Sequence, residues 1–168
     1  MIRRWSVLFL LGMGILGLDF WSKGLVVTHL QEMNSIEYPY GGIPVFQGWG
    51  GIDFAVVHVV NRGVAWGCLA EFSDYLPYLR IAILIGLLIH FYRTAAGFLY
   101  RSALILVMAG ACGNVIDYFR YHHVIDMFYF VFWGYSYPVF NLADSAIFCG
   151  VMGLFFHSWL RRRQEVYD

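Results

Sequence analysis

Four long apolar stretches divide the chain, and polar residues gather between them. They cover residues 5–28, 76–92, 102–119 and 139–160. A helix needs about 20 mostly apolar residues to cross a hydrocarbon core of about 30 Å, because each residue adds about 1.5 Å. The pattern therefore predicts an all-α polytopic membrane protein with four transmembrane helices, built as a single domain over residues 1–168.

The first stretch also has features of a signal peptide, because Arg3 and Arg4 precede an apolar run. No small-x-small cleavage motif follows this run, and apolar residues resume at Leu25, after Asp19 and Lys23. We therefore expect the first stretch to be retained as a helix.

Two segments between the predicted spans have patterns of their own. Residues 30–74 contain several Gly and Pro turn signals, and within them residues 52–60 alternate well enough to be a strand. We expect a small β-rich cradle there, lying on the membrane. Residues 120–138 are dense in Tyr, Phe and Trp, which favour the headgroup level, and are expected to follow the interface.

Composition supports membrane residence. Of the 168 residues, 60% are hydrophobic and 13% charged, whereas soluble domains have about 45–50% and about 25%. The balance of 11 basic against 11 acidic residues gives no support for nucleic-acid binding.

The basic residues set the orientation. Seven of the eleven flank the predicted spans on one side: Arg3, Arg4, Arg93, Arg101 and residues 161–163. Because cytoplasmic flanks carry the excess of Lys and Arg, this side is expected to be cytoplasmic, with both termini inside and the β-rich cradle outside.

Three carboxylates lie at one depth in three different predicted helices. At about 1.5 Å per residue, Asp19 is about 22 Å from Arg4, Asp117 about 24 Å from Arg101, and Asp144 about 25 Å from Arg161. An ionisable residue inside a span is costly and is therefore a functional candidate. The three carboxylates are expected to share one site near the outer side.

Other polar residues share helix faces with these carboxylates. Lys23 follows Asp19 by four residues, so the two are either a mutually neutralised pair or a contact for substrate. Asn114 and Arg120 each lie three residues from Asp117 on the third predicted helix.

Asn141 precedes Asp144 by three residues and either lines the site or caps the fourth helix. Asp126 lies between apolar neighbours, which are expected to raise its pKa.

Two such carboxylates brought together could not both ionise easily. One would keep a proton and polarise an amide carbonyl, while the other would activate water, as in aspartic proteases. His122 and His123 near Asp126 suggest a metal site, but no third ligand follows at helical spacing.

Five motifs occur in the order found in one known family. They are D-F-W-S-K (residues 19–23), N-R-G-V-A-W-G (61–67), G-N-V-I-D (113–117), V-I-D (124–126) and F-N-L-A-D (140–144). In this order, and with four spans, the chain resembles lipoprotein signal peptidase, also called signal peptidase II.

The resemblance implies an aspartyl endopeptidase of the bacterial inner membrane, with its active site on the outer (periplasmic) side. Such enzymes remove the signal peptide from prolipoproteins, cutting just before a diacylglyceryl-modified Cys. The implied partners are this substrate, membrane lipid and inhibitory peptide antibiotics such as globomycin. No metal or organic cofactor is implied, and nothing requires more than a monomer.

The resemblance also assigns roles to residues. It implies that Asp126 and Asp144 are catalytic, a choice that the residues alone leave open between Asp126 and Asp117. The remaining motif positions are expected to bind substrate or support the site: Asp19, Lys23, Asn61, Gly63, Asn114, Asp117, Arg120, Asn141 and Ala143.

The chain departs from the family pattern at three positions. Tyr118 stands where the family usually has Arg after the G-N-x-x-D motif, and we hypothesise that Arg120 supplies the missing guanidinium. Val64 replaces an Ala, and Met127 a Phe; both replacements keep the site apolar.

A non-catalytic membrane protein is the alternative function. A transporter subunit could use buried Asp and Lys as an ion or proton relay. The polar residues of this chain gather toward the outer side instead of crossing the midplane, where transporters usually place their sites.

Overall fold

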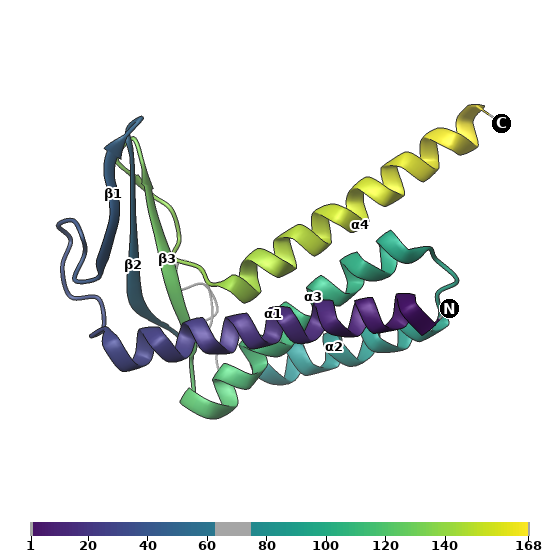
Figure 1. Ribbon diagram of the computed structural model, residues 1–168, viewed down its shortest axis with the longest axis horizontal. Coiled ribbons are helices and arrows are strands. Elements are labelled where there is room, and N and C mark those ends of the chain that lie inside the picture. Colours follow the sequence, from purple (N-terminus) through teal and green to yellow (C-terminus); the bar gives the residue numbers. More distant parts are fainter. Residues whose placement is uncertain (1, 63–74, 168) are drawn as a thin grey trace.

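The computed structural model describes residues 2–62 and 75–167, and four long helices dominate it (Figure 1). They are α1 (Ile2–His29), α2 (Leu76–Arg93), α3 (Phe98–Tyr121) and α4 (Leu142–Tyr167). Each is long and apolar enough to cross a membrane, as predicted.

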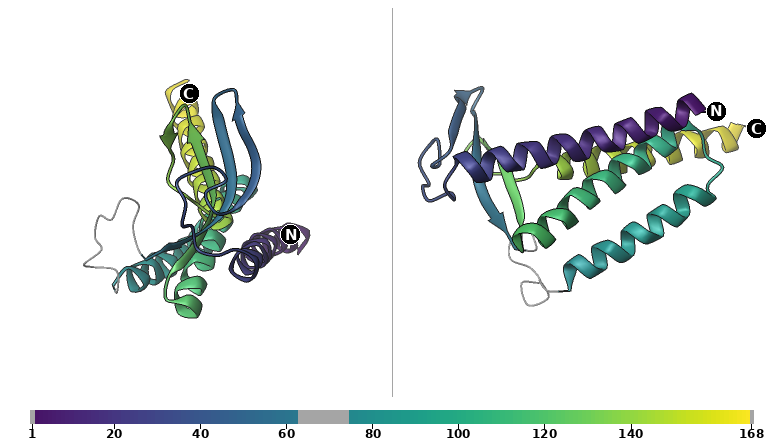
Figure 2. Two further views of the ribbon diagram at one scale, coloured as in Figure 1. Left: turned by 90° about the vertical axis from the view of Figure 1, so that its left-hand side faces the viewer. Right: turned by 60° about the horizontal axis from the view of Figure 1, so that its bottom comes forward.

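Helix α3 is the centre of the bundle, because it contacts each of the other three helices. Glycines allow α3 and α4 to approach closely. A Cβ at Gly110 would collide with the Ala143 carbonyl oxygen, and one at Gly150 would lie 2.6 Å from the Ala103 carbonyl oxygen. Small residues of this kind are typical where membrane helices pack backbone to backbone. The views in Figure 2 show α1 and α2 diverging on either side of α3.

A four-stranded antiparallel sheet stands at one end of the helices (Figure 1). Its strands, in spatial order, are β1 (Ile43–Trp49), β2 (Ile52–Asn61), β3 (Val124–Phe132) and β4 (Tyr135–Ser136). The combination of four apolar helices and a small sheet confirms the predicted fold class.

Strand β3 comes from the segment that the sequence predicted only as an interfacial stretch. Its nine residues, V-I-D-M-F-Y-F-V-F, show no alternation of apolar and polar positions, because its first four residues are buried on both faces. This strand pairs with β2 along its length, so Asn61 lies opposite Val124 and Val59 opposite Asp126. The pairing joins residues that lie 63 (Asn61 and Val124) to 80 (Ile52 and Phe132) positions apart in sequence.

The turn between α3 and β3 fixes how the two elements meet. His122 ends α3 in the left-handed region (φ 60°), and its backbone N–H donates to the Tyr118 carbonyl oxygen. The chain then reverses directly into β3. As a result, the Asp117 carboxylate lies 3.4 Å from the Ile125 backbone nitrogen, from which it accepts a hydrogen bond.

Candidate active site

Polar side chains are buried together where the helices meet the sheet. They come from α1, α3, β3 and the residue before α4, and none is more than 7% exposed: Asp19, Lys23, Asn114, Asp117, Asp126 and Asn141. Asp144, in the first turn of α4, completes this group and is only half-buried. Polar groups so deeply buried are costly unless they are paired.

Lys23 is the central cation. Its Nζ lies 2.7 Å from Asp19 Oδ2 and 2.7 Å from Asp117 Oδ2, and it donates to Asn114 Oδ1 at 3.1 Å. An ammonium group has three donors, and all three are used here. Lys23 is therefore shared between two carboxylates and has no donor left for a substrate in this arrangement.

Asp19 ties α1 to the other two helices. Its Oδ1 accepts the Ala143 backbone N–H at 2.9 Å, which satisfies a donor at the start of α4. The approach to α3 needs a glycine, because a Cβ at Gly113 would lie 2.7 Å from Asp19 Oδ2. Ala143 itself is fully buried at this junction.

Asn141 and Asp144 form a reciprocal cap at the start of α4. The Asp144 backbone N–H donates to Asn141 Oδ1 at 2.9 Å, and the Asn141 backbone N–H donates to Asp144 Oδ2 at 3.2 Å. The i, i+3 spacing is that of a capping box, which starts α4 at Leu142. Asn141 is thus a helix cap and a member of the site at once.

The same Asn141 links two carboxylates. Its Nδ2 donates to Asp126 Oδ1 at 2.7 Å, while its backbone N–H holds Asp144. A second amide serves each carboxylate: Asn61 Nδ2 donates to Asp126 Oδ2 at 2.8 Å, and Asn114 Nδ2 donates to Asp144 Oδ1 at 2.8 Å. Three asparagines therefore orient two aspartates whose backbones belong to β3 and α4.

The two carboxylates have unequal surroundings. Burial and, after it, the nearby charge of Asp144 raise the pKa of Asp126 to about 7, against the lowering effect of Asn61, Asn141 and Lys23. Asp126 is therefore about half protonated near neutral pH. A buried carboxyl that can hold a proton, beside a second carboxyl that is only half-buried, suits acid–base chemistry on a carbonyl.

A pocket opens beside Asp144. It has a volume of about 380 Å³ and is lined largely by aromatic rings: Phe130, Phe132, Tyr137, Phe140, Asp144, Ser145, Phe148 and Cys149. The sequence predicts residues 120–138 as an interfacial segment. That prediction does not identify the aromatic side chains of this segment as part of the site. The signal available was the i, i+2 spacing of Phe128, Phe130 and Phe132 in β3, which puts these side chains on one face of the sheet.

Two predicted site residues lie elsewhere or outside the described part. Arg120 is exposed, and its guanidinium stacks 4.7 Å from the Phe20 ring centroid and 4.9 Å from that of Tyr121. Within residues 2–62 and 75–167, the cation paired with Asp117 is Lys23, not Arg120. Gly63 lies outside the described residues, and among those described no three His, Cys, Asp or Glu side chains could hold a metal ion.

Comparison with known proteins identifies the family. The family profile described as signal peptidase (SPase) II matches residues 11–160, which is most of the chain. The chain belongs to the signal peptidase II family. Its motifs, its four helices and its paired carboxylates agree with this assignment.

Two bacterial relatives match this chain over most of their length. The lipoprotein signal peptidase of Bacillus velezensis is 35% identical over 153 residues, covering 89% of this chain and 91% of that protein. That of Anoxybacillus flavithermus is 32% identical over 159 residues, covering 94% and 88%.

A solved structure of a bacterial membrane enzyme has a similar fold. A bacterial membrane enzyme determined by the in meso method at 2.3 Å matches with a TM-score of 0.77 and 25% identity, over 95% of this chain and 91% of that one.

Family membership decides between the two functions that the sequence left open. Signal peptidase II is a peptidase, so the chain is an aspartic-type lipoprotein signal peptidase and not a non-catalytic relay. The arrangement of polar residues agrees, because they form one cluster at the sheet end of the helices.

Proposed function

We propose that this signal peptidase cleaves prolipoproteins just before a diacylglyceryl-modified Cys, with Asp126 and Asp144 as its catalytic pair. The observation that carries the proposal is the bridge through Asn141, which bonds to both carboxylates, one of which lines the aromatic pocket. One of the two has a pKa of about 7, so the pair can hold a single proton at neutral pH.

The surroundings of the two carboxylates favour different roles. Asp126 is almost completely buried and retains its proton most readily, so it acts as the general acid that polarises the scissile carbonyl. Asp144 is half-buried and lines the pocket, so it is the carboxyl that a water molecule in the pocket can reach. It therefore acts as the general base.

The reaction then balances with water as the only co-reactant. Asp144 takes a proton from water as the water oxygen bonds to the carbonyl carbon, and Asp126 gives its proton to the carbonyl oxygen. When the carbon–nitrogen bond breaks, Asp144 returns its proton to the leaving amine and Asp126 regains the hydroxyl proton.

The remaining polar residues support this pair. Asn61, Asn114 and Asn141 orient the carboxylates, and their amides are also the groups within reach of a substrate backbone. An extended backbone that enters the bilayer needs such partners, because hydrocarbon offers it no hydrogen bonds. The contacts of Lys23 with Asp19 and Asp117 hold α1 against α3.

The substrate is expected to approach from the bilayer. The pocket beside Asp144 suits hydrocarbon, because aromatic rings make up most of its lining. Peptide antibiotics such as globomycin would compete there. The enzyme works as a monomer in the bacterial inner membrane. Both termini are cytoplasmic and the site faces the outer side, because most basic residues flank the helix ends opposite the site.

Cleavage of a defined substrate tests the function. The purified protein should convert a diacylglyceryl-modified prolipoprotein to a product whose first residue is the modified Cys, as mass spectrometry of the product would establish. The same prolipoprotein without the diacylglyceryl group is the control and should be cleaved at least about tenfold more slowly. Cleavage at another bond, or no cleavage by a folded preparation, would contradict the proposal.

A further inference from the structure

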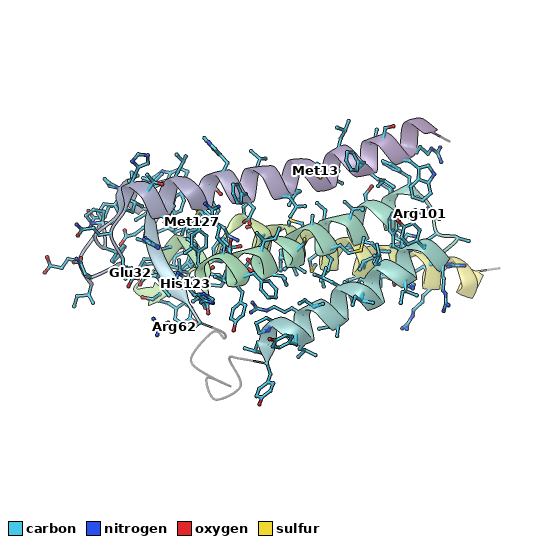
Figure 3. The ribbon with its side chains drawn as sticks, turned by 90° about the horizontal axis from the view of Figure 1, so that it is seen from below. Met13, Glu32, Arg62, Arg101, His123 and Met127 are labelled. Atoms are coloured by element: carbon cyan, nitrogen blue, oxygen red, sulfur yellow. The ribbon has the colours of Figure 1, made fainter. Side chains whose placement is uncertain are left out.

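A second pocket lies at the opposite end of the helices from the carboxylates. It has a volume of about 340 Å³ and lies where the start of α1 meets the connection between α2 and α3. Arg4, Trp5 and Leu8 line it from α1, and residues 95–98 with Arg101 line the other side. Figure 3 shows Arg101 at this end, far from Met127 and the sheet.

Arg101 is held in place there without being neutralised. Its Nε donates to the Ala96 carbonyl oxygen at 3.3 Å, and its Nη2 donates to the Thr94 carbonyl oxygen at 2.7 Å. The guanidinium also stacks 4.8 Å from the centroid of the Trp5 ring. A guanidinium has more N–H donors than these two contacts use, so donors remain for a ligand.

The charge of this pocket has no counter-ion within the described part of the chain. Residues 1–18 and 75–116 contain no Asp or Glu, and neither Arg4 nor Arg101 forms an ion pair with a side chain of residues 4–62 or 75–163. The first turn of α3 adds to the positive potential, because Gly97 at its start provides no side-chain cap. The pocket therefore favours an anion.

An apolar groove continues from this pocket toward the middle of the helices. The groove has a volume of about 380 Å³ and shares Leu8 with the pocket. It lies between α1 and α2, with α3 as its floor: Leu8, Phe9, Gly12, Met13, Leu16, Leu84, Ile85, Leu88, Ile105, Met108, Ala109 and Cys112. In Figure 3, α1 with Met13 and α2 lie on either side of α3.

The dimensions of pocket and groove suit one kind of molecule. Leu16 is 12 residues beyond Arg4, about 18 Å along α1, and half of a hydrocarbon core is about 15 Å. A cationic pocket joined to an apolar groove of that length matches a phosphate joined to an acyl chain. Basic pockets between transmembrane helices are known to hold lipid headgroups.

We infer that this pocket and groove bind one anionic phospholipid, with its phosphate against Arg4 and Arg101 and an acyl chain along the groove. An anionic headgroup is favoured over a zwitterionic one, because the zwitterionic headgroup brings its own cation into a site that has no acid. Free phosphate would use the pocket alone and leave the groove unoccupied. The inference is separate from the proposed cleavage reaction, because no residue of the carboxylate cluster takes part.

Native mass spectrometry of the detergent-purified protein tests the inference. The protein would be titrated with phosphatidylglycerol, with phosphatidylcholine of the same acyl chains, and with glycerol phosphate. We expect retention of one phosphatidylglycerol at the lowest concentrations, with at least about fivefold weaker retention of phosphatidylcholine and none of glycerol phosphate. Equal retention of both lipids, or binding of glycerol phosphate as tight as that of the lipid, would overturn it.

Matched variants locate the site. Arg4→Gln should weaken retention of phosphatidylglycerol about fivefold, the factor that corresponds to about 1 kcal/mol for a basic residue at a membrane surface. Arg93→Gln is the control, because Arg93 is exposed at the same end and does not line the pocket. Equal loss in the two variants would point to general surface charge and contradict the inference.

A second pair tests the groove. Leu84→Trp fills the groove, whereas Ile83→Trp places the same ring on an exposed face of α2 outside it. Only Leu84→Trp should weaken lipid retention, and unchanged retention in that variant would exclude the acyl part of the inference.

Discussion

At the scale of single residues, one cation determines the charge of the buried cluster. Lys23 is 1% exposed and contacts two carboxylates and one amide, so it is the cation that stabilises Asp19 and Asp117 inside the bundle. The sequence could predict the Asp19–Lys23 pair from its i, i+4 spacing. The third partner, Asp117, depends on how α1 packs on α3, and no local pattern records that packing.

Removal of this cation should destabilise the fold strongly. Lys23→Met leaves two buried carboxylates without their counter-ion, and breaking a buried ion pair costs about 3–5 kcal/mol. The measurement is the free energy of unfolding in detergent. Adding Asp117→Asn to Lys23→Met should recover part of the loss. Arg120→Gln is the control, because Arg120 is exposed, and it should change the free energy of unfolding by less than about 0.5 kcal/mol. A loss this small for Lys23→Met would contradict the role of Lys23 as the buried counter-ion.

The pH profile should report the proton of Asp126. Its pKa of about 7 predicts that kcat/KM falls as the pH rises through about 7, because the general acid is lost. Asn61 donates to the charged carboxylate and so lowers this pKa. Asn61→Ala should therefore move the alkaline limb to higher pH, measured over pH 5–9 in the same detergent. A limb that stays in place or moves to lower pH would exclude Asp126 as the titrating acid.

The raised pKa of Asp126 also has a consequence for stability. The folded state binds this proton more tightly than the unfolded state, in which an Asp titrates near about 4. The contribution to stability is complete below about pH 4 and is lost as the pH rises to about 7. Asp126→Asn should abolish this part of the pH dependence of unfolding.

At the scale of elements, the site depends on how closely α3 and α4 approach. The four helices follow directly from the apolar stretches, whereas strand β3 was not predictable as a strand because its aromatic run does not alternate. The capping box at Asn141 and Asp144 is visible in the sequence as an i, i+3 pair, and the structure shows that capping and carboxylate orientation use the same residues.

Adding one methyl group at the helix contact tests this dependence. Gly110→Ala puts a Cβ against the Ala143 carbonyl oxygen and 2.8 Å from an Ile147 side-chain carbon. Overpacking of this kind costs about 1–3 kcal/mol, and it should lower activity by separating Asn114 from Asp144. The control is Gly86→Ala, where a Cβ meets nothing within 4 Å. This variant should be unchanged or up to about 1 kcal/mol more stable; equal effects would contradict the packing argument.

At the scale of the whole molecule, the fold joins five distant pieces of chain at one end of the bundle. Equal depth in the predicted helices identified Asp19, Asp117 and Asp144 as neighbours. Depth could not separate Asp117 from Asp126 as the partner of Asp144; that choice came from the family resemblance. The structure gives a physical difference: Asp117 faces Lys23, whereas Asp126 shares Asn141 with Asp144.

Cleavage assays on three aspartate variants test whether Asp126 and Asp144 are the catalytic pair. The initial rate on a diacylglyceryl-modified prolipoprotein would be compared for the wild-type protein, Asp126→Asn, Asp144→Asn and Asp117→Asn, each verified as folded. The account predicts a loss of at least about 100-fold for each of the first two and a loss within about tenfold for Asp117→Asn. Near wild-type cleavage by either Asp126→Asn or Asp144→Asn would contradict the assignment of the catalytic pair.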